Sequence, residues 1–275
     1  MEQKQSGTGS SLVAAGLAFS LVVLTFSTIY FFLKRTWWFP EPISAFAESI
    51  DQQFGRTLFI TGVVFFLAQL ALGYVIFRYR DRGGRAHYSH GNTMLEILWT
   101  SATAVMFIGL GLAAERAWAS LYWMGAAPGA MQVEVTGKQF VWSFRYPGVD
   151  GQFGRTDPSL VNDAAGNPVG LDTSDPAAQD DIVAPTMAVR VNQEVEVILR
   201  ATDVTHSFFV RELRFKQDAV PGMIIRLHFK AEKTGTYEVV CAELCGLGHH
   251  RMRTVLRVLS QDEFQAWLRE QAQEL

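Results

Sequence analysis

The sequence of 275 residues has only two cysteines and no Cys-x-x-Cys-His stretch, so it carries no attachment motif for a covalently bound haem. It has no basic cluster of the kind that binds nucleic acid, and its formal net charge is −3. Internal repeats and low-complexity tracts are missing as well. After about residue 114 no stretch is apolar enough to cross a bilayer, so a membrane anchor has to lie in the N-terminal part.

Three long apolar runs occupy that N-terminal part, at about residues 10–33, 57–79 and 93–114. The first has no charge, and the third carries one acid, Glu96. Each is long enough to span a membrane as a helix. The first run is longer than the apolar core of a signal peptide and has no small-residue cleavage site directly after it, which favours a retained helix. Residues 1–120 are therefore predicted to form a helical membrane anchor.

The orientation of this anchor follows from its loops. Lys34 and Arg35, after the first run, are outnumbered by four arginines between the second and third runs: Arg78, Arg80, Arg82 and Arg85. Because positive loops stay in the cytoplasm, the third helix exits outward. We therefore expect a multi-pass protein of a bacterial-type inner membrane, with its C-terminal domain on the periplasmic side.

Between the first two runs, apolar residues recur every three or four positions, at Ile43, Phe46, Ala47, Ile50 and Phe54. This spacing predicts a short amphipathic helix. It would lie on the outer membrane face or pack against the anchor's own helices.

From about Met131 onward, short segments rich in β-branched and aromatic residues alternate with Gly, Pro and Asn. They are MQVEVTG, FVWSFRY, MAVRV, EVEVILRA, MIIRLHFK, TYEVV and TVLRVL. Strands at such spacing predict an all-β sandwich or barrel over residues 130–260.

An insertion at about 147–187 interrupts these strands with seven aspartates and a single arginine. It is either a solvated loop or an acidic face that attracts a basic partner. Residues 261–275 are predicted to form an amphipathic helix, because Ser260 and Glu263 make a capping-box pattern ahead of an apolar stripe. The stripe consists of Phe264, Trp267 and Leu268.

Both cysteines lie in VVCAELCGLGHHRMR at residues 239–253, which also holds two histidines and a methionine. Three kinds of site fit this stretch. A Cys241–Cys245 disulfide suits an exported domain with an even cysteine count. A zinc ion would take two cysteines and two histidines and leave the methionine without a role.

Copper is the third possibility. A single copper takes one Cys, two His and a weak axial Met on a β-sandwich, and Cys245, His249 and Met252 supply the usual tight loop. The second histidine would be His206, about 35 residues earlier at the start of a strand. Cys241 is then left over, whereas two coppers bridged by two thiolates would use both cysteines.

Two motifs, C-x-E-x-C-G-x-x-H-x-x-M and the upstream D-V-x-H-S-F, resemble the binuclear copper (CuA) domain of cytochrome c oxidase subunit II. KQDAVPG at 216–222 is similar to the family's segment after the first histidine. HGNTMLEILWT at 90–100 is similar to the start of its last membrane helix. The resemblance implies membrane helices followed by a cupredoxin-like Greek-key β-sandwich. Three predicted helices instead of the family's usual two, and the long insertion, are departures.

This resemblance also implies the ligands of the copper pair: the side chains of His206, Cys241, Cys245, His249 and Met252, and the main-chain carbonyl of Glu243. In the family the carboxylate at the position of Glu243 reaches a magnesium ion at the boundary with subunit I. The alternative for Glu243 is a solvent-facing loop acid.

The family function implied for this chain is electron transfer. An electron from cytochrome c or a similar soluble donor would pass through the copper pair to haem in subunit I. There oxygen is reduced to water with proton translocation, so this chain contributes no catalytic residue of its own. The alternatives are the CuA subunit of a nitric oxide reductase and a structural or copper-delivery membrane protein. Partners would be subunit I and other oxidase subunits.

Two further sites follow from the resemblance. The family's glutamate at the position of Glu96 lies at the mouth of a proton pathway into subunit I; otherwise Glu96 is a first-turn acid stabilised by the helix dipole. In GKQFVWSFRYPG at 137–148, Phe140 takes the position of the family's electron-receiving tryptophan, with Trp142 two residues on. Both aromatic residues could equally be part of a strand's core.

Overall fold

A computed structural model describes residues 3–35, 38–82, 84–85 and 87–273. Its contacts divide the chain into two compact units. The helical unit comprises residues 1–38 and 52–114, and the sandwich unit comprises residues 39–51 and 115–275.

Three helices in the described residues are long and apolar enough to cross a membrane: α1 (Gln3–Lys34), α2 (Ala45–Arg78) and α3 (Thr93–Tyr122). Their apolar windows have mean hydropathies of 2.2, 2.2 and 1.8. Phe26 of α1 meets Phe66 of α2 edge to face, with ring centroids 6.1 Å apart. Most of the large apolar side chains on these helices are exposed, as expected for surfaces that face lipid.

Residues 43–54 do not form the separate amphipathic helix that their spacing suggests. Ser44 caps α2 by accepting a hydrogen bond from the Ala47 N–H at 3.1 Å, and the helix then continues unbroken to Arg78. The apolar face of its first turns is buried in the sandwich unit, where Ile43 is 2% exposed. Ile43 pairs there through its backbone, donating to the Glu212 carbonyl and accepting from the Glu232 N–H. The periodicity therefore marks an intramolecular contact with the β-domain.

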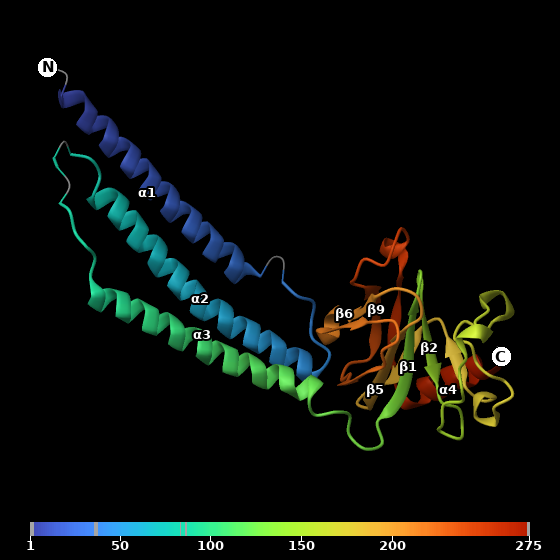
Figure 1. Ribbon diagram of the computed structural model, residues 1–275. Coiled ribbons are helices and arrows are strands. Elements are labelled where there is room, and N and C mark those ends of the chain that lie inside the picture. Colours follow the sequence, from blue (N-terminus) through green and yellow to red (C-terminus); the bar gives the residue numbers. More distant parts are fainter. Residues whose placement is uncertain (1–2, 36–37, 83, 86, 274–275) are drawn as a thin grey trace. The chain divides into compact units, whose positions relative to one another are not determined.

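Ten strands among the described residues form two five-stranded sheets, which confirms the predicted β-sandwich (Figure 1). One sheet has the order β3-β2-β1-β5-β8 and the other β4-β10-β9-β6-β7. The strands are β1 (Met131–Lys138), β2 (Val141–Tyr146), β3 (Ile182–Ala184), β4 (Met187–Arg190), β5 (Glu194–Ala201), β6 (His206–Val210), β7 (Phe215–Ala219), β8 (Ile225–Lys230), β9 (Gly235–Cys241) and β10 (Arg253–Leu259).

The core lies between the two sheets, because alternate residues of the strands point inward. Val133, Phe144 and Leu199 from one sheet and Phe208 and Leu256 from the other are completely buried. The strand pattern in the sequence misses the short strands β3 and β7, whereas β6 is the strand that His206 is expected to begin.

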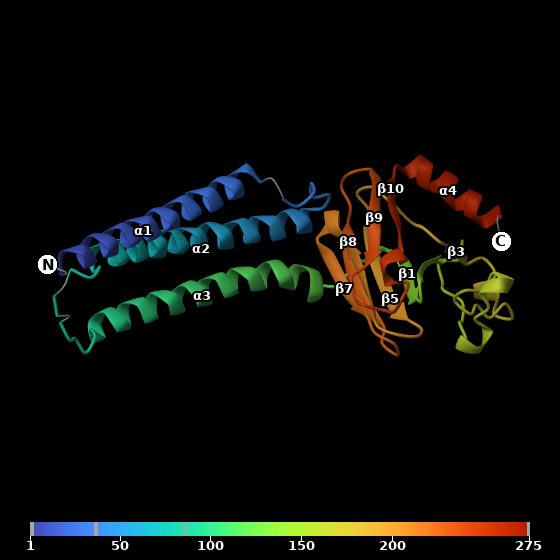
Figure 2. The ribbon, with the colours of Figure 1, turned by 90° about the horizontal axis from the view of Figure 1, so that it is seen from above.

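The predicted C-terminal helix is present as α4 (Gln261–Gln273) beside the sandwich (Figure 2). Its capping box is formed: the Ser260 N–H donates to Glu263 Oε2 at 2.9 Å, and the Glu263 N–H donates to Ser260 Oγ at 3.4 Å. The buried ring of Trp267 meets Tyr146 edge to face at 5.2 Å. The apolar stripe of this helix therefore completes the core of its own domain.

Many aspartates of the insertion form bonds within it. Asp157 and Asp175 each accept a backbone N–H at the start of a short 3-10 helix, and Asp180 accepts the N–H of Val149 at 2.6 Å. Asp181 is 1% exposed and accepts two hydrogen bonds from Arg145, at 3.0 and 2.5 Å. These bonds make the insertion an ordered structure built on aspartate caps.

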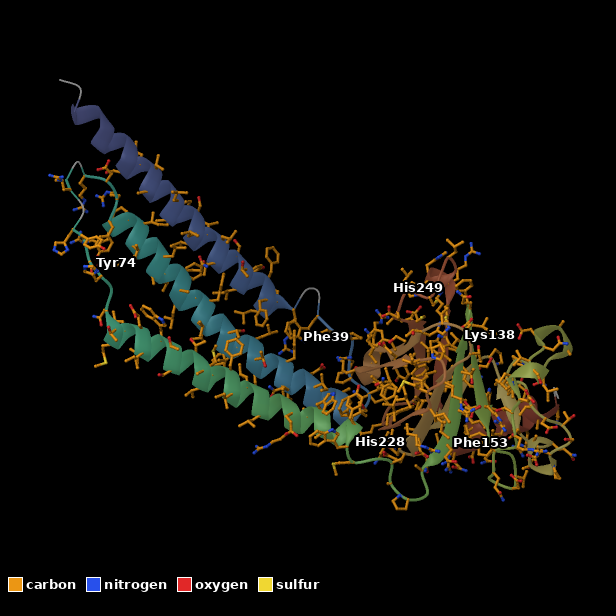
Figure 3. The ribbon with its side chains drawn as sticks, viewed as in Figure 1. Phe39, Tyr74, Lys138, Phe153, His228 and His249 are labelled. Carbon is orange, nitrogen blue, oxygen red and sulfur yellow. The ribbon has the colours of Figure 1, made fainter. Side chains whose placement is uncertain are left out.

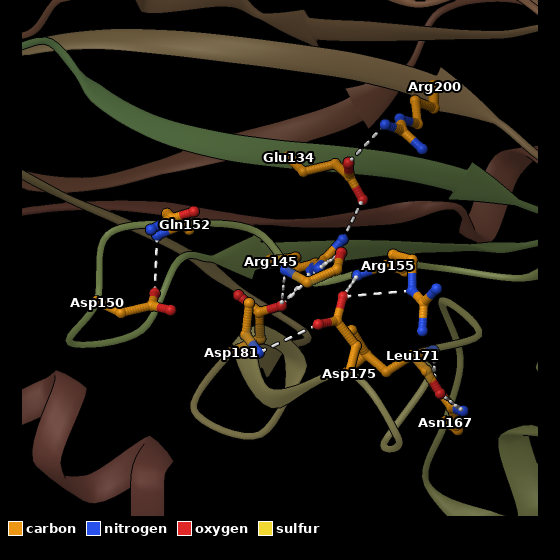
Figure 4. A network of polar contacts seen from close by, with 12 residues as sticks. Glu134, Arg145, Asp150, Gln152, Arg155, Asn167, Leu171, Asp175, Asp181 and Arg200 are labelled. Carbon is orange, nitrogen blue, oxygen red and sulfur yellow. Dashed lines mark hydrogen bonds and ion pairs between the residues drawn. The ribbon is translucent and has the colours of Figure 1, made fainter.

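The Asp181–Arg145 pair continues into a buried network (Figure 4). Arg145 Nη1 lies 3.4 Å from Glu134 Oε1, and Arg200 Nη2 lies 3.1 Å from Glu134 Oε2. Arg145 also donates to the Gly154 carbonyl. The network connects Asp181 of the insertion to residues on β1, β2 and β5. Each buried charge in it needs its partners, because they offset the hydration that the charge loses on burial.

Replacing Asp181 with alanine is expected to destabilise the protein by about 3–5 kcal/mol, because Arg145 would keep a buried charge without its closest partner. Asp163→Ala is the matched control, since it removes the Lys138–Asp163 pair, in which the Asp163 side chain is 62% exposed, and is expected to cost less than about 1 kcal/mol. Chemical unfolding of the purified chain in detergent, followed by near-ultraviolet circular dichroism, measures both. Equal losses in the two variants would contradict the buried network.

Candidate metal centre

Sheet pairing brings the two distant parts of the copper motif together. His206 is the first residue of β6 and Cys241 is the last of β9; these strands are neighbours, with Phe208 opposite Cys241. On the other side of β9, the Cys241 N–H donates to the Met252 carbonyl at 3.0 Å, just before β10 begins. Residues 206, 241 and 252 therefore meet at one end of three adjacent strands.

The remaining donors come from the loop between β9 and β10. A single 3-10 turn (His249–Arg251) follows Gly248 and places His249 and Met252 on the same side as Cys245. Gly246 has φ +133°, a backbone conformation that only glycine adopts without strain. His249 and Lys138, which are labelled in Figure 3, lie at the same end of the sandwich.

The donor atoms form a continuous group with the two sulfurs at its centre. The Sγ atoms of Cys241 and Cys245 are 3.9 Å apart. Cys241 Sγ lies 3.9 Å from His206 Nδ1, and Cys245 Sγ lies 3.7 Å from His249 Nδ1. Each sulfur thus has one imidazole beside it.

Two weaker donors complete the group. Met252 Sδ lies 3.7 Å from Cys245 Sγ, and the Glu243 carbonyl oxygen lies 3.1 Å from Cys241 Sγ. Met252 and His206 are at most 1% exposed, so water is excluded from this side of the group.

This donor set distinguishes among the three kinds of site. Both cysteines are free thiols, and 3.9 Å is about twice the length of a disulfide bond. Two thiols, two imidazoles, a thioether and a carbonyl exceed the four ligands of a structural zinc ion. Soft sulfur donors favour copper. Two sulfurs at the centre, with one imidazole on each side, fit a pair of copper ions.

Asp203 and Gln139, which the sequence does not identify as site residues, support this donor group from outside. Asp203 Oδ1 lies 2.8 Å from His206 Nε2, which leaves Nδ1 of that ring directed at Cys241. Burial acts to raise the pKa of Asp203, but hydrogen bonds from Gln139, His206 and Val204 outweigh it and lower the pKa. Asp203 is the first residue of the D-V-x-H-S-F motif, so this motif could have identified it as a site residue. No pattern in the sequence distinguishes Gln139.

The two aromatic residues of the β1–β2 hairpin have different surroundings. Trp142 is 3% exposed, and its ring meets that of His206 edge to face with centroids 6.0 Å apart. Phe140 is half-buried and covers the loop that holds Cys245. A Cβ atom added to Gly248 would lie only 2.4 Å from the Phe140 ring, so the close approach requires glycine.

Other predicted site residues lie outside the donor group. The Glu243 side chain is exposed, although its carbonyl belongs to the group. Glu96 is exposed in the first turn of α3, in the helical unit. Asn92 caps this helix by accepting from the N–H groups of Met94 and Leu95. Glu96 therefore lies at the positive end of a helix dipole.

The cysteine pair predicts a pH dependence for the metal-free protein. Burial and the neighbouring Cys241 raise the pKa of the Cys245 thiol from 9.0 to about 11. Between these two pH values the unfolded chain loses a proton that the folded chain keeps, so folding stability falls as pH rises, by about 2–3 kcal/mol in total. Below pH 9 the thiol keeps its proton in both the folded and the unfolded chain, so it causes no fall in stability there.

Unfolding of the metal-free chain at pH 8, 9, 10 and 11 measures this fall, with Cys245→Ala as the reference that lacks the thiol. The difference between wild type and variant should shrink or reverse toward pH 11. A difference that does not change with pH would contradict the raised pKa.

Comparison with known proteins gives matches to both units. Residues 131–259 match the family description "Cytochrome C oxidase subunit II, periplasmic domain". Residues 33–114 match "Cytochrome C oxidase subunit II, transmembrane domain".

Among curated proteins, the alternative cytochrome c oxidase subunit 2 of Bradyrhizobium diazoefficiens is 37% identical, over 93% of this chain and 91% of that protein. Cytochrome c oxidase subunit 2 of Thermostichus vulcanus is 32% identical, over 84% of this chain and 77% of that protein. Among solved structures, the periplasmic domain of cytochrome oxidase subunit II from Bradyrhizobium japonicum is 31% identical. It matches 54% of this chain and 97% of its own, with a TM-score of 0.39.

The family matches cover α2, most of α3 and the β-domain in the family's own order, and they agree with the resemblance carried by the sequence motifs. The C-terminal domain is the family's periplasmic domain, and the helices before it anchor the protein in the bacterial inner membrane. The family implies a binuclear copper centre, and among the described residues His206, Cys241 and Cys245 form a cluster that could hold a metal ion. The chain belongs to the cytochrome c oxidase subunit II family.

Proposed function

We propose that this chain is the electron-accepting subunit of a haem–copper terminal oxidase, and that six residues hold its copper pair. They are His206, Cys241, Cys245, His249 and Met252 through their side chains, and Glu243 through its carbonyl. One observation carries the assignment: two free thiols lie 3.9 Å apart, each with one imidazole beside it.

When bound, a copper pair shared by two thiolates supplies a one-electron carrier whose charge is spread over both metals. The residues of this chain keep that carrier in a fixed geometry. His206 and Cys241 are anchored on neighbouring strands, and Met252 is held by the bond from Cys241. Because strand ends move little, few atoms rearrange when the charge of the site changes.

The electron donor is cytochrome c or a similar soluble protein, and it docks on the loop that covers the site. Leu247 in this loop is 98% exposed, and Phe140 lies against its two glycines. Phe140 is the first aromatic ring that a docked donor meets. Trp142 is buried beside His206 and continues the path inward. Aromatic side chains such as Phe140 are enriched at protein–protein interfaces relative to the rest of the surface.

The electron leaves toward haem in subunit I, and we assign Glu243 to the boundary with that subunit. Its carbonyl is part of the donor group, and its exposed side chain is free to bind a magnesium ion at the boundary between the subunits. Carboxylate oxygens are ligands that magnesium prefers. One residue therefore links the copper site to the subunit boundary.

Oxygen is the terminal acceptor that the relatives favour, because they are cytochrome c oxidase subunits. The catalytic site that reduces oxygen lies in subunit I, and this chain supplies electrons to it. Glu96 lies at the mouth of a proton pathway into that subunit. The arginine-containing loop before α3 supports this role, because it places the first turn of α3 on the cytoplasmic side, where protons are taken up.

Metal content and spectra of the purified complex test the copper assignment. We expect two coppers in this chain and a seven-line electron paramagnetic resonance signal. Cys241→Ser should abolish that signal, because the bridging pair of thiolates is lost. Glu243→Gln should keep it, because the backbone carbonyl remains, while the magnesium content falls. A four-line signal from the wild type would exclude the pair, and turnover of nitric oxide but not oxygen with reduced cytochrome c would support the reductase alternative.

Electron input is tested with Phe140→Ala. Loss of an aromatic contact at the centre of a docking surface is expected to raise the KM for reduced cytochrome c about ten-fold. The copper signal should not change. Val149→Ala, which truncates a fully exposed apolar residue of the insertion, serves as the control. An unchanged KM in Phe140→Ala would remove Phe140 from the docking surface.

Proton uptake is tested with Glu96→Gln, which keeps the shape of the side chain but removes its titratable group. We expect steady-state oxygen consumption to fall by about ten-fold or more, while reduction of the copper pair by cytochrome c stays at the wild-type rate. Glu115→Gln, at an exposed position near the other end of α3, should be normal. If Glu96→Gln consumes oxygen normally, Glu96 serves only the helix dipole.

A further inference from the structure

The tight turn between β1 and β2 touches both halves of the donor group. Lys138 and Val141 are the last paired residues of the hairpin, so Gln139 and Phe140 form its two-residue turn. The Gln139 side chain crosses to the β9–β10 loop, where Nε2 donates to the Cys245 carbonyl at 2.6 Å.

The backbone of the same residue supports the other half. The Gln139 N–H donates to Asp203 Oδ2 at 2.7 Å, and Oδ1 of that carboxylate lies 2.8 Å from His206 Nε2. A chain of hydrogen bonds therefore runs from the His206 imidazole through Asp203 and Gln139 to the peptide of Cys245. It connects the β5–β6 loop with the β9–β10 loop outside the strands.

The contact is close enough to depend on glycine. A Cβ atom added to Gly246 would lie 2.8 Å from Gln139 Nε2, and Phe140 leaves no room for one at Gly248. The amide group is thus fitted against the peptide that follows Cys245. Although Gln139 is an exposed residue, its amide nitrogen is directed at the protein's own backbone.

We propose that Gln139 is a positioning residue for the copper site: its amide holds the Cys245 peptide, and its backbone N–H holds Asp203 against His206. This inference rests on the proposed function and extends it to a residue outside the donor group. The amide also presents the positive end of its dipole to the site. It therefore favours the reduced, less positive state of the site and raises its reduction potential.

The test compares Gln139→Met, which keeps the length of the side chain but has no donor, with Gln132→Met. Gln132 lies on β1, the strand that leads into this turn, and donates to Glu196 at 2.7 Å, so the control removes a side-chain amide bond elsewhere. Gln139→Glu, in which a carboxylate would face the Cys245 carbonyl, is a second variant in case the first does not fold.

In the metal-free full-length chain, amide hydrogen exchange of residues 242–252 is measured by mass spectrometry. Gln139→Met should exchange about five-fold faster than wild type, which corresponds to the loss of one hydrogen bond of about 1 kcal/mol. In the copper-loaded Gln139→Met variant, the reduction potential of the copper site should shift to more negative values, and the visible absorption bands of the site should move. Gln132→Met should match wild type in all three measurements.

Wild-type exchange, potential and spectrum in Gln139→Met would overturn the inference, as would equal changes in both methionine variants. The result is separable from the proposed function. A wild-type chain without the copper-pair signal would refute that function, whereas a wild-type chain with the signal and an unaffected Gln139→Met would refute only the role of Gln139.

Discussion

The pairing of β6 with β9 is the interaction on which the metal centre depends. It places His206, at the start of one strand, beside Cys241, at the end of the other, although 35 residues separate them. Neighbouring strands lie about 4.8 Å apart, so donors at their ends come within bonding reach of a common metal. The β9–β10 pair then adds Met252 through its backbone bond to Cys241. Without the first pairing the cysteine loop would lack the His206 imidazole, and without the second it would lose the backbone bond that holds Met252.

The surroundings of the donor group restrict its movement. Strands hold His206 and Cys241, and one short turn holds His249 and Met252. A carrier of single electrons benefits from such restriction, because the ligands need not rearrange between oxidation states. The hydrogen-bond chain through Asp203 and Gln139 adds a link between loops where the strands end. Copper binding, electron transfer and the stability of the β-domain therefore depend on the same contacts.

The negative charge of the insertion is largely used in building it. Asp157 and Asp175 cap short helices, and Asp181 is paired with Arg145 in the domain interior. The cysteine loop, by contrast, exposes two apolar side chains, Leu244 at 77% and Leu247 at 98%. Counting aspartates in the sequence does not distinguish a charge that serves a turn from one that faces a partner, because the count does not record their bonds.

The sequence by itself determined the membrane anchor, the β-domain and the donor types, because these depend on local composition and short spacing. The cysteine loop, with the spacing C-x-E-x-C-G-x-x-H-x-x-M, needs one turn to gather most of its donors. Only the tertiary structure decided that residues 43–47 belong to the sandwich unit, that Trp142 is buried while Phe140 is not, and that Gln139 reaches Cys245. Each of these features depends on which strands and loops become neighbours, and that is set by packing between segments far apart in the chain.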